Sequence, residues 1–264
     1  MSTNQKTLVV FHRCGGKSLG YPPNTILTIN WALSYGAKAI EYDVVFCNDD
    51  GRPKIVVVEP KLLKEQNLDV NNLNYTDVVQ INAGNPKYGF CKVPLLDEVL
   101  ELTKGLVAQQ IHIKGKHQLT IATLLLKLTG YKNFILTSFD LNVLKEIKKL
   151  NASIKIGWII KPNLESGDEG AGDLTATVSS EKNSSPYTTK ELNFIINQAY
   201  KAGVDVVILC GPKIAEKTTV RKVREAGFEV GAWGVGSNLE LAKKLIGFNI
   251  DRFTLNNPEQ LVYN

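Results

Sequence analysis

The sequence is short of several features that would place it in a class at once. It has four cysteines and three histidines in 264 residues, and no Cys-x-x-Cys pair, so a structural zinc site is not expected. No apolar run reaches the roughly 18 residues that a membrane helix needs. The polar start, Met-Ser-Thr-Asn-Gln-Lys, has no signal-peptide core. We therefore expect a cytoplasmic protein with no integral membrane segment.

A strong charge of one sign is also missing. The chain has 31 Lys and Arg against 26 Asp and Glu, a net charge of +5, and no basic block dominates any stretch. We therefore expect no nucleic-acid partner. A hydrophobic fraction of 44% with 22% charged residues is ordinary for globular proteins and excludes disordered or fibrous chains. Nothing marks a domain boundary, so we expect one domain over residues 1–264.

The wide spacing of the cysteines favours free, partly buried thiols in a reducing compartment. Cys14 and Cys47 both follow strand-like apolar runs, which leaves a disulfide between them open. Cys14 could instead act as a nucleophile, although no sequence signature pairs a histidine with it.

Short apolar runs alternate with segments of helical period along the whole chain. Several runs are continuously apolar, as in parallel strands that are buried on both faces. The predicted strands cover residues 8–11, 39–46, 106–113, 134–136, 154–160, 204–209, 230–233 and 250–255. Helical spacing of apolar residues occurs at 95–102, 141–150 and 239–246, among other places.

About eight strands with helices between them predict a single (β/α)8 TIM barrel. A doubly wound open sheet is the main alternative, but no Gly-x-Gly-x-x-Gly follows the first strand and there is no Walker loop. Residues 47–94 are predicted as an insertion after the second strand, with a turn, a short extra strand at 55–58 and an irregular excursion. The Gly- and Ser-rich composition of segment 161–187 predicts a mobile loop over the barrel mouth or a disordered surface loop.

Polar residues stand where the first three predicted barrel strands end, at the face that carries TIM-barrel active sites. The first strand ends in His12 and Arg13, the second carries Glu41 and Asp43 two residues apart, and the third carries His112 and Lys114 with the same spacing. Alternation places each such pair on one face of its strand. Paired carboxylates suit a divalent metal, cationic side chains suit phosphate, and histidines move protons. We interpret the six residues as one site.

At this point the sequence resembles a known family, the glycerophosphodiester phosphodiesterases. That family has His-Arg-Gly, Pro-Glu-Asn-Thr, a Glu-x-Asp-Val strand and an Asp-Gly-x-Pro turn, in this order. The corresponding segments here are His12-Arg13-Cys14-Gly15, Pro22-Pro23-Asn24-Thr25, Glu41-Tyr42-Asp43-Val44 and Asp50-Gly51-Arg52-Pro53. Later segments are also similar, namely Val93–Leu100, Ile111–Lys114, Ser138–Asp140, Ala232–Val235 and Asp251–Thr254 with Pro258.

The resemblance implies a (β/α)8 barrel that hydrolyses glycerophosphodiesters, small-molecule substrates, to an alcohol and glycerol 3-phosphate with a divalent metal. His12 would be one of two acid/base histidines. Arg13 and Lys114 would hold phosphate oxygens. Glu41 and Asp43 would hold the metal, and Trp233 would line the substrate mouth. The role in lipid metabolism would follow from that activity.

The departures from the family pattern bear on catalysis. The second acid/base histidine aligns with Val58, which carries no proton, so Glu59 or His112 would have to substitute. The third metal carboxylate is replaced by His112, which should weaken Mg²⁺ or Ca²⁺ and favour Mn²⁺ or Zn²⁺ relatively. The sequence therefore predicts a slow or altered phosphodiesterase. The alternatives are a non-catalytic relative that binds a phosphate-bearing ligand or a protein partner, and a lyase-type relative like the spider-toxin sphingomyelinases D.

Overall fold

The computed structural model describes residues 6–114, 118–162 and 185–261. By their contacts these residues form two compact units. Unit 1 comprises the described residues within 1–10, 136–255 and 260–264, and unit 2 comprises those within 11–135 and 256–259. Most of the segment 161–187, predicted as a loop, lies outside the described residues. Among the residues that are described, no helix is long and apolar enough to cross a membrane.

Strands and helices alternate as the apolar periodicity predicts. The strands are β1 (Leu8–Phe11), β2 (Ala39–Asp49), β3 (Arg52–Val57), β4 (Ala108–Ile113), β5 (Phe134–Ser138), β6 (Ile156–Ile159), β7 (Val206–Cys210), β8 (Glu229–Trp233) and β9 (Arg252–Leu255). The helices are α1 (Ile26–Ser34), α2 (Pro60–Glu65), α3 (Tyr75–Val78), α4 (Leu96–Thr103), α5 (Gln118–Lys127), α6 (Leu141–Leu150), α7 (Thr189–Ala202), α8 (Lys217–Glu225) and α9 (Leu239–Gly247). This is the architecture of a (β/α)8 barrel with an insertion after its second strand, as predicted.

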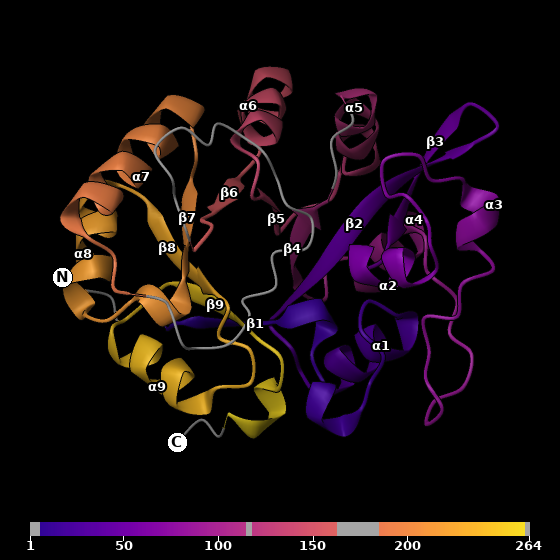
Figure 1. The fold of residues 1–264 in the computed structure, drawn as a ribbon, viewed down its shortest axis with the longest axis horizontal. Coiled ribbons are helices and arrows are strands. Elements are labelled where there is room, and N and C mark those ends of the chain that lie inside the picture. The colour runs from indigo at the N-terminus through magenta and orange to yellow at the C-terminus, as the bar shows by residue number, and fades with distance from the viewer. Residues whose placement is uncertain (1–5, 115–117, 163–184, 262–264) are drawn as a thin grey trace. The chain divides into compact units, whose positions relative to one another are not determined.

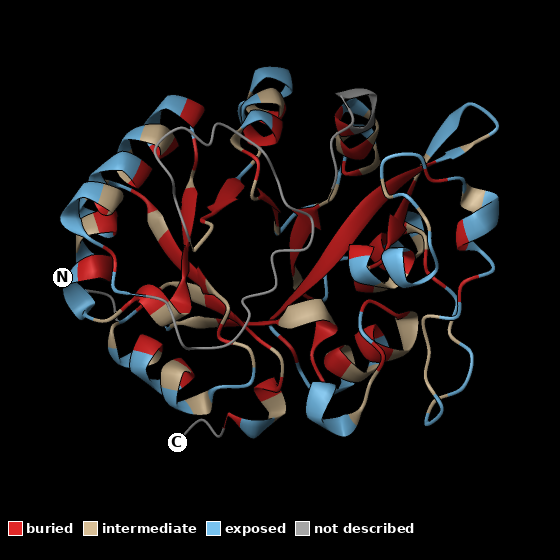
Figure 2. Cartoon of the chain, in the orientation of Figure 1, coloured by how far each residue is buried: buried red, intermediate tan, exposed pale blue. Residues whose placement is uncertain are grey.

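In unit 1, parallel pairing runs from β5 through β6, β7 and β8 to β9. Helices α7 and α8 lie along the outer side of β7 and β8 (Figure 1). Each helix of this unit turns a buried stripe inward and an exposed stripe outward (Figure 2). Their capping residues are polar, as in Thr188, whose side chain accepts a hydrogen bond from the backbone N–H of Glu191 at the start of α7.

In unit 2, β2 pairs in parallel with β4 and in antiparallel with β3. The nine residues Ala39–Cys47 of β2 are all buried, so this strand forms the floor of the unit. Its register with β4 sets Glu41 opposite Gln110 and Asp43 opposite His112. The polar residues of the two strands therefore meet on one face.

The insertion differs from its prediction in one respect. The extra strand is present as β3, but the stretch expected to be irregular contains the short helices α2 and α3. Leu63 and Val78 from these helices are fully buried in an apolar cluster with Val56 and Val58 of the β3 end. Because apolar residues from the short helices complete this small core, the excursion folds as a part of unit 2.

All four cysteines are free thiols, and Cys14, Cys47 and Cys210 are buried. The disulfide left open between Cys14 and Cys47 is therefore not formed. Burial raises the pKa of the Cys14 thiol well above its usual value, and the carboxylates Glu41 and Asp43 raise it further. A protonated thiol of this kind is a poor nucleophile, so the geometry gives no support to a nucleophilic Cys14.

Candidate active site

Two buried carboxylates stand at the centre of unit 2. Glu41 and Asp43 lie two residues apart on β2, and their side chains are only 2% and 1% exposed. Burial of two like charges is costly unless cationic or hydrogen-bonding groups accompany them. Strand β4 supplies one such group: His112 Nδ1 lies 3.3 Å from Asp43 Oδ1 and 3.6 Å from Glu41 Oε1.

Asp43 also contacts two cationic side chains. Arg13 Nε lies 3.2 Å from Asp43 Oδ2, and Lys114 Nζ lies 3.2 Å from Asp43 Oδ1. Burial alone would raise the pKa of this carboxyl, but Lys114, His112 and Arg13 hold the pKa well below its usual range. Asp43 is therefore ionised at neutral pH and anchors the cluster.

A tight turn after β1 aims the arginine at the carboxylates. Arg13 and Cys14 have positive φ values of 50° and 69°, which cost about 1–3 kcal/mol each for residues with a side chain. The Arg13 N–H donates to Glu41 Oε2 at 2.9 Å, which helps to hold the turn. Gly16 continues it at φ 69°, and a Cβ there would lie 2.9 Å from a ring carbon of Tyr21. Only glycine fits this position.

Arg13 also contacts Glu59, which lies two residues after the end of β3. Glu59 Oε2 lies 2.7 Å from Arg13 Nη1, and its side chain is 18% exposed. Val58 points the opposite way, into the apolar cluster of unit 2, and is 2% exposed. Val58 therefore has no contact with the polar cluster, and Glu59 is the residue of this segment that reaches it. The alignment of Val58 with the second acid/base histidine stays a prediction. Burial raises the pKa of Glu59, although the Arg13 charge opposes the shift.

His12 lies between Glu41 and Asn256, a residue from a distant part of the sequence. Its Nε2 lies 3.8 Å from Glu41 Oε2, and its Nδ1 lies 2.6 Å from Asn256 Oδ1. Burial lowers the pKa of His12, although Glu41 acts in the opposite direction. The imidazole is therefore neutral at neutral pH and able to accept a proton.

Asn24 supports Asp43 from the loop before α1. Its Nδ2 donates to Asp43 Oδ2 at 3.3 Å, and its Oδ1 accepts the Asp43 N–H at 3.4 Å. Asn24 is buried and has a φ of 60°, a conformation that asparagine adopts more readily than most residues. One side chain thus fixes both the backbone and the carboxylate of Asp43.

The donor set fits a divalent metal ion. Glu41, Asp43 and His112 each offer one ligand atom, and these atoms lie within 4.8 Å of one another. Among the described residues, the cationic side chains Arg13 and Lys114 contact this carboxylate cluster. A divalent cation held by Glu41, Asp43 and His112 would add positive charge beside them, which an anionic ligand requires.

Comparison with known proteins identifies the family. The model of the glycerophosphoryl diester phosphodiesterase family matches residues 12–260. The chain belongs to this family. A glycerophosphodiester phosphodiesterase of Bacillus altitudinis is 33% identical over 118 residues. That match covers 43% of this chain and 46% of the relative, less than half of either.

Solved structures of family members share the barrel fold. A putative glycerophosphoryl diester phosphodiesterase from Silicibacter pomeroyi matches with a TM-score of 0.75 at 19% identity, over 97% of this chain and 92% of that chain. A phosphodiesterase from Oleispira antarctica, solved with the product sn-glycerol-3-phosphate, matches with the same TM-score and identity over 97% and 95%. A member from Thermotoga maritima reaches 0.68 at 20% identity, over 96% of both chains. These likenesses confirm the predicted fold class.

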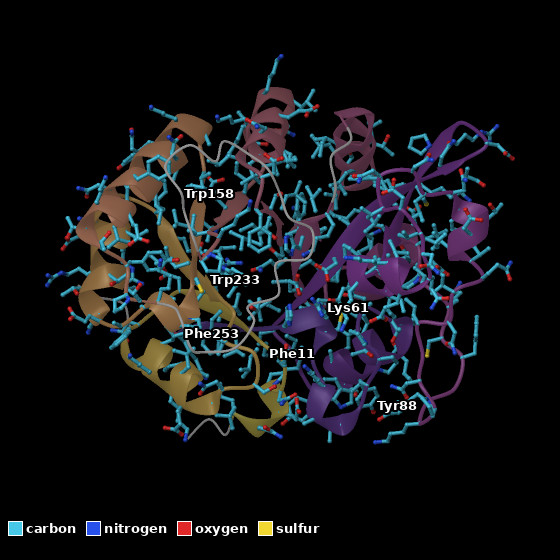
Figure 3. The ribbon with its side chains drawn as sticks, viewed as in Figure 1. Phe11, Lys61, Tyr88, Trp158, Trp233 and Phe253 are labelled. Carbon is cyan, nitrogen blue, oxygen red and sulfur yellow. The ribbon has the colours of Figure 1, made fainter. Side chains whose placement is uncertain are left out.

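Of the residues predicted for the site of this family member, all but one lie in unit 2 and are joined by the contacts above. Trp233 belongs to unit 1, where it ends β8 (Figure 3). Its indole N–H donates to the Ile160 carbonyl at 2.8 Å, and its ring meets Phe139 edge-on with centroids 5.0 Å apart. Its role in lining the substrate mouth stays a prediction.

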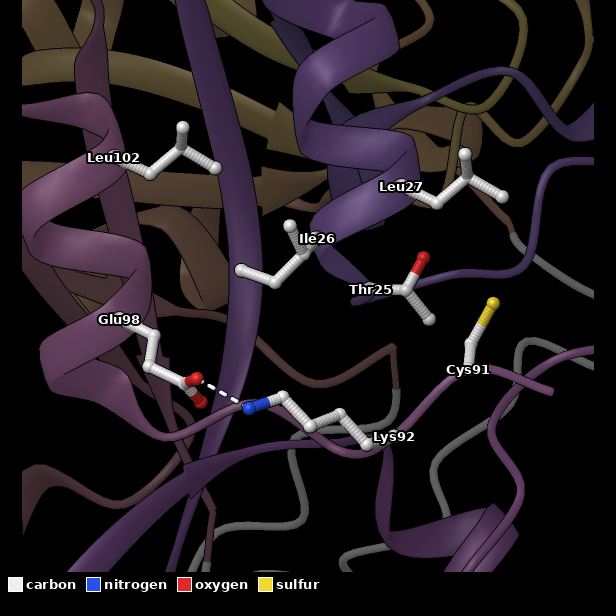
Figure 4. A pocket seen from close by; sticks show the side chains of 7 residues that line it. All are labelled: Thr25, Ile26, Leu27, Cys91, Lys92, Glu98 and Leu102. Carbon is white, nitrogen blue, oxygen red and sulfur yellow. Dashed lines mark hydrogen bonds and ion pairs between the residues drawn. The ribbon is translucent and has the colours of Figure 1, made fainter.

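Unit 2 also has a cavity of about 380 Å³ that shares no residue with the polar cluster. Its lining is mainly apolar, with an ion pair between Lys92 and Glu98 at one side and the Cys91 thiol at the other (Figure 4). The residues that line it are Thr25, Ile26, Leu27, Cys91, Lys92, Glu98 and Leu102. The cavity therefore offers no carboxylate pair or histidine of the kind that the polar cluster holds.

Sequence reasoning missed two asparagines of the cluster. Asn24 stands in the Pro-Pro-Asn-Thr segment, where its position in a family motif was a usable signal. Asn256 lies 244 residues from His12, and nothing local in the sequence points to their hydrogen bond. Contacts of this kind depend on the closing of the fold rather than on any short pattern.

Proposed function

We propose that this chain hydrolyses a glycerophosphodiester to an alcohol and glycerol 3-phosphate with the help of a divalent metal. The observation that carries the proposal is the junction of a buried carboxylate pair, Glu41 and Asp43, with two phosphate-binding cations, Arg13 and Lys114, beside a neutral histidine. Membership of the family supports the reaction class. A glycerol phosphate product is recorded for the Oleispira antarctica relative. One domain and a cytoplasmic location stay predictions.

Glu41, Asp43 and His112 would hold the metal, which supplies positive charge to stabilise the phosphate in the transition state. The imidazole among the ligands favours Mn²⁺ or Zn²⁺ relative to Mg²⁺ or Ca²⁺, because nitrogen donors suit the softer ions. Arg13 and Lys114 would bind the non-bridging phosphate oxygens. The planar guanidinium of Arg13 can bind two oxygens at once.

Hydrolysis needs two proton transfers. A P–O bond forms to water as the P–O bond to the alcohol breaks, so water loses one proton and the leaving alkoxide gains one. His12 Nε2 can accept the first proton because burial keeps the imidazole neutral. Glu59 can donate the second, because burial raises the pKa of its carboxyl. A phosphate that draws Arg13 away from Glu59 removes the charge that opposes this shift.

The first experiment is release of glycerol 3-phosphate from a panel of glycerophosphodiesters with Mg²⁺, Ca²⁺, Mn²⁺ or Zn²⁺. Glu41→Gln should abolish metal-dependent turnover, whereas Glu101→Gln, which changes an exposed glutamate on α4, should leave turnover unchanged. Phosphorus NMR of the product distinguishes hydrolysis from a lyase-type reaction, because internal attack by a substrate hydroxyl gives a cyclic phosphate. Equal activity of both variants would refute the proposal.

One observation favours a non-catalytic phosphate-binding protein as the second candidate. The guanidinium of Arg13 is held on two sides by Asp43 and Glu59, and the segment that should carry the second histidine presents a carboxylate instead. Such a protein would bind glycerol 3-phosphate in a titration, with no turnover under any metal. The two candidates therefore give opposite results in the same assay.

A further inference from the structure

The two ring nitrogens of His12 have different surroundings. Nδ1 lies 2.6 Å from Asn256 Oδ1, a hydrogen-bond distance, whereas Nε2 lies 3.8 Å from Glu41 Oε2, beyond one. The amide oxygen can only accept a hydrogen bond, so a hydrogen bond in this orientation of the amide places the proton of a neutral ring on Nδ1. The Nε2 lone pair is then left on the side of the buried carboxylates.

The chain holds Asn256 from several directions. It follows β9 directly, and its backbone carbonyl accepts the Lys17 N–H at 3.3 Å. The next residue, Asn257, is buried, and its Oδ1 accepts the Ser18 N–H at 2.8 Å. Pro258 packs so closely on the glycine turn that a Cβ at Gly15 would lie 3.1 Å from its ring. The segment is thus fastened to the loop that follows His12.

We propose that Asn256 is a positioning residue that holds neutral His12 in the Nδ1–H tautomer, so that Nε2 is the proton acceptor of the reaction. Only the role of Nε2 as the proton acceptor rests on the proposed function. The tautomer itself is a property of the resting protein. In the opposite arrangement the amide would be turned by half a rotation, Nδ2 would donate to a bare Nδ1, and Nε2 would carry the proton.

Nitrogen-15 NMR separates these two arrangements directly, since the chemical shifts of protonated and bare ring nitrogens differ widely. The chain has three histidines, so His112→Gln and His117→Gln variants suffice to assign the His12 signals. The spectrum is recorded on metal-free protein at about pH 8, above the ordinary histidine pKa of about 6.5. We expect a protonated Nδ1 for His12 in the wild type and a loss of this preference in Asn256→Leu. A protonated Nε2 in the wild type would overturn the proposal.

Kinetics then test the role of the tautomer. Asn256→Leu should lower kcat at least about tenfold, because the wrong histidine tautomer disables proton acceptance, and should change KM by less than about twofold. Asn256→Asp keeps an acceptor at the same place and should restore both the tautomer and most of kcat. Asn257→Ala removes a hydrogen bond to the same loop but touches no His12 atom, so its spectrum and kcat should stay close to wild type.

The outcomes separate this proposal from the proposed function. A wild-type Nδ1–H tautomer that depends on Asn256, in a protein with no turnover, would sustain the positioning role in the fold and refute the phosphodiesterase activity. Turnover that falls equally in Asn256→Leu and Asn257→Ala would show a general loosening of the loop and overturn the positioning role. Failure of Asn256→Asp to restore kcat when the tautomer is restored would also count against it.

Discussion

Introducing a histidine at position 58 should damage the protein rather than improve it. The family alignment sets Val58 against a catalytic histidine, yet the Val58 side chain is 2% exposed and packs in the apolar cluster behind β3. An imidazole there is larger than valine and adds two polar nitrogens without an apparent partner among the apolar neighbours. Overpacking costs about 1–3 kcal/mol, and a buried polar group without a hydrogen bond costs about 1–3 kcal/mol. Val58→His should therefore lower the free energy of unfolding by about 2–6 kcal/mol.

The matched variant is Glu59→His, one residue further along. Glu59 is partly exposed beside Arg13, so loss of its ion pair should cost about 1 kcal/mol or less. Urea unfolding and glycerol 3-phosphate release are measured on both variants and on Glu59→Gln. We expect Glu59→His to retain activity, Glu59→Gln to lose about 100- to 10,000-fold if its proton is used, and Val58→His to gain none. A Val58→His protein as stable as wild type, with raised turnover, would refute the orientation of this segment.

Three further predictions concern the metal, the turn and the fold. Asp43→Asn should lower Mn²⁺ affinity at least about tenfold in calorimetric titration, because it removes a charged ligand; unchanged affinity would exclude this carboxylate as a ligand. Gly16→Ala should lower the free energy of unfolding by at least about 1–3 kcal/mol in urea, because it adds a Cβ at φ 69° against Tyr21; a neutral effect would mean that the turn is not tight. Burial would raise the pKa of Glu229, but Arg252 and Lys155 lower it below the ordinary value of 4.5. The stability that ionised Glu229 contributes is therefore present above pH 4.5 and disappears as the pH falls through the lowered pKa. Glu229→Gln should therefore destabilise the protein near neutral pH and lose its effect in acid, when unfolding is followed from pH 7 downward; a difference independent of pH would contradict the ion pairs.

The parts of the fold that follow a simple period could be predicted from the sequence. Strand β1 has the predicted bounds, and β4 starts two residues later than predicted, because Leu106 belongs to the exposed turn before it. The helices of the insertion could not be predicted from the sequence. Helices α2 and α3 are too short for a periodic pattern to show, and they are stabilised by the small core that they share with β3.

The candidate site could be predicted where strand alternation decides which way a side chain points. Glu41 and Asp43 share a face for that reason, and their contacts with His112 and Lys114 follow from the register of two neighbouring strands. Strand alternation does not decide the segment after β3, because the strand ends at Val57 and a shift of one residue there exchanges Val58 for Glu59 as the side chain that meets the site.

The discontinuous make-up of unit 2 has a consequence for synthesis on the ribosome. Residues 11–135 need the segment 256–259 to complete the unit, including the hydrogen bond between His12 and Asn256. That segment is made about 120 residues after Ile135, at about 5–20 residues per second. Asn256, the hydrogen-bond partner of His12, is therefore absent for about 6–24 seconds after Ile135 has been made. Unit 2 can therefore be completed only after residues 136–255 of unit 1 have been synthesised.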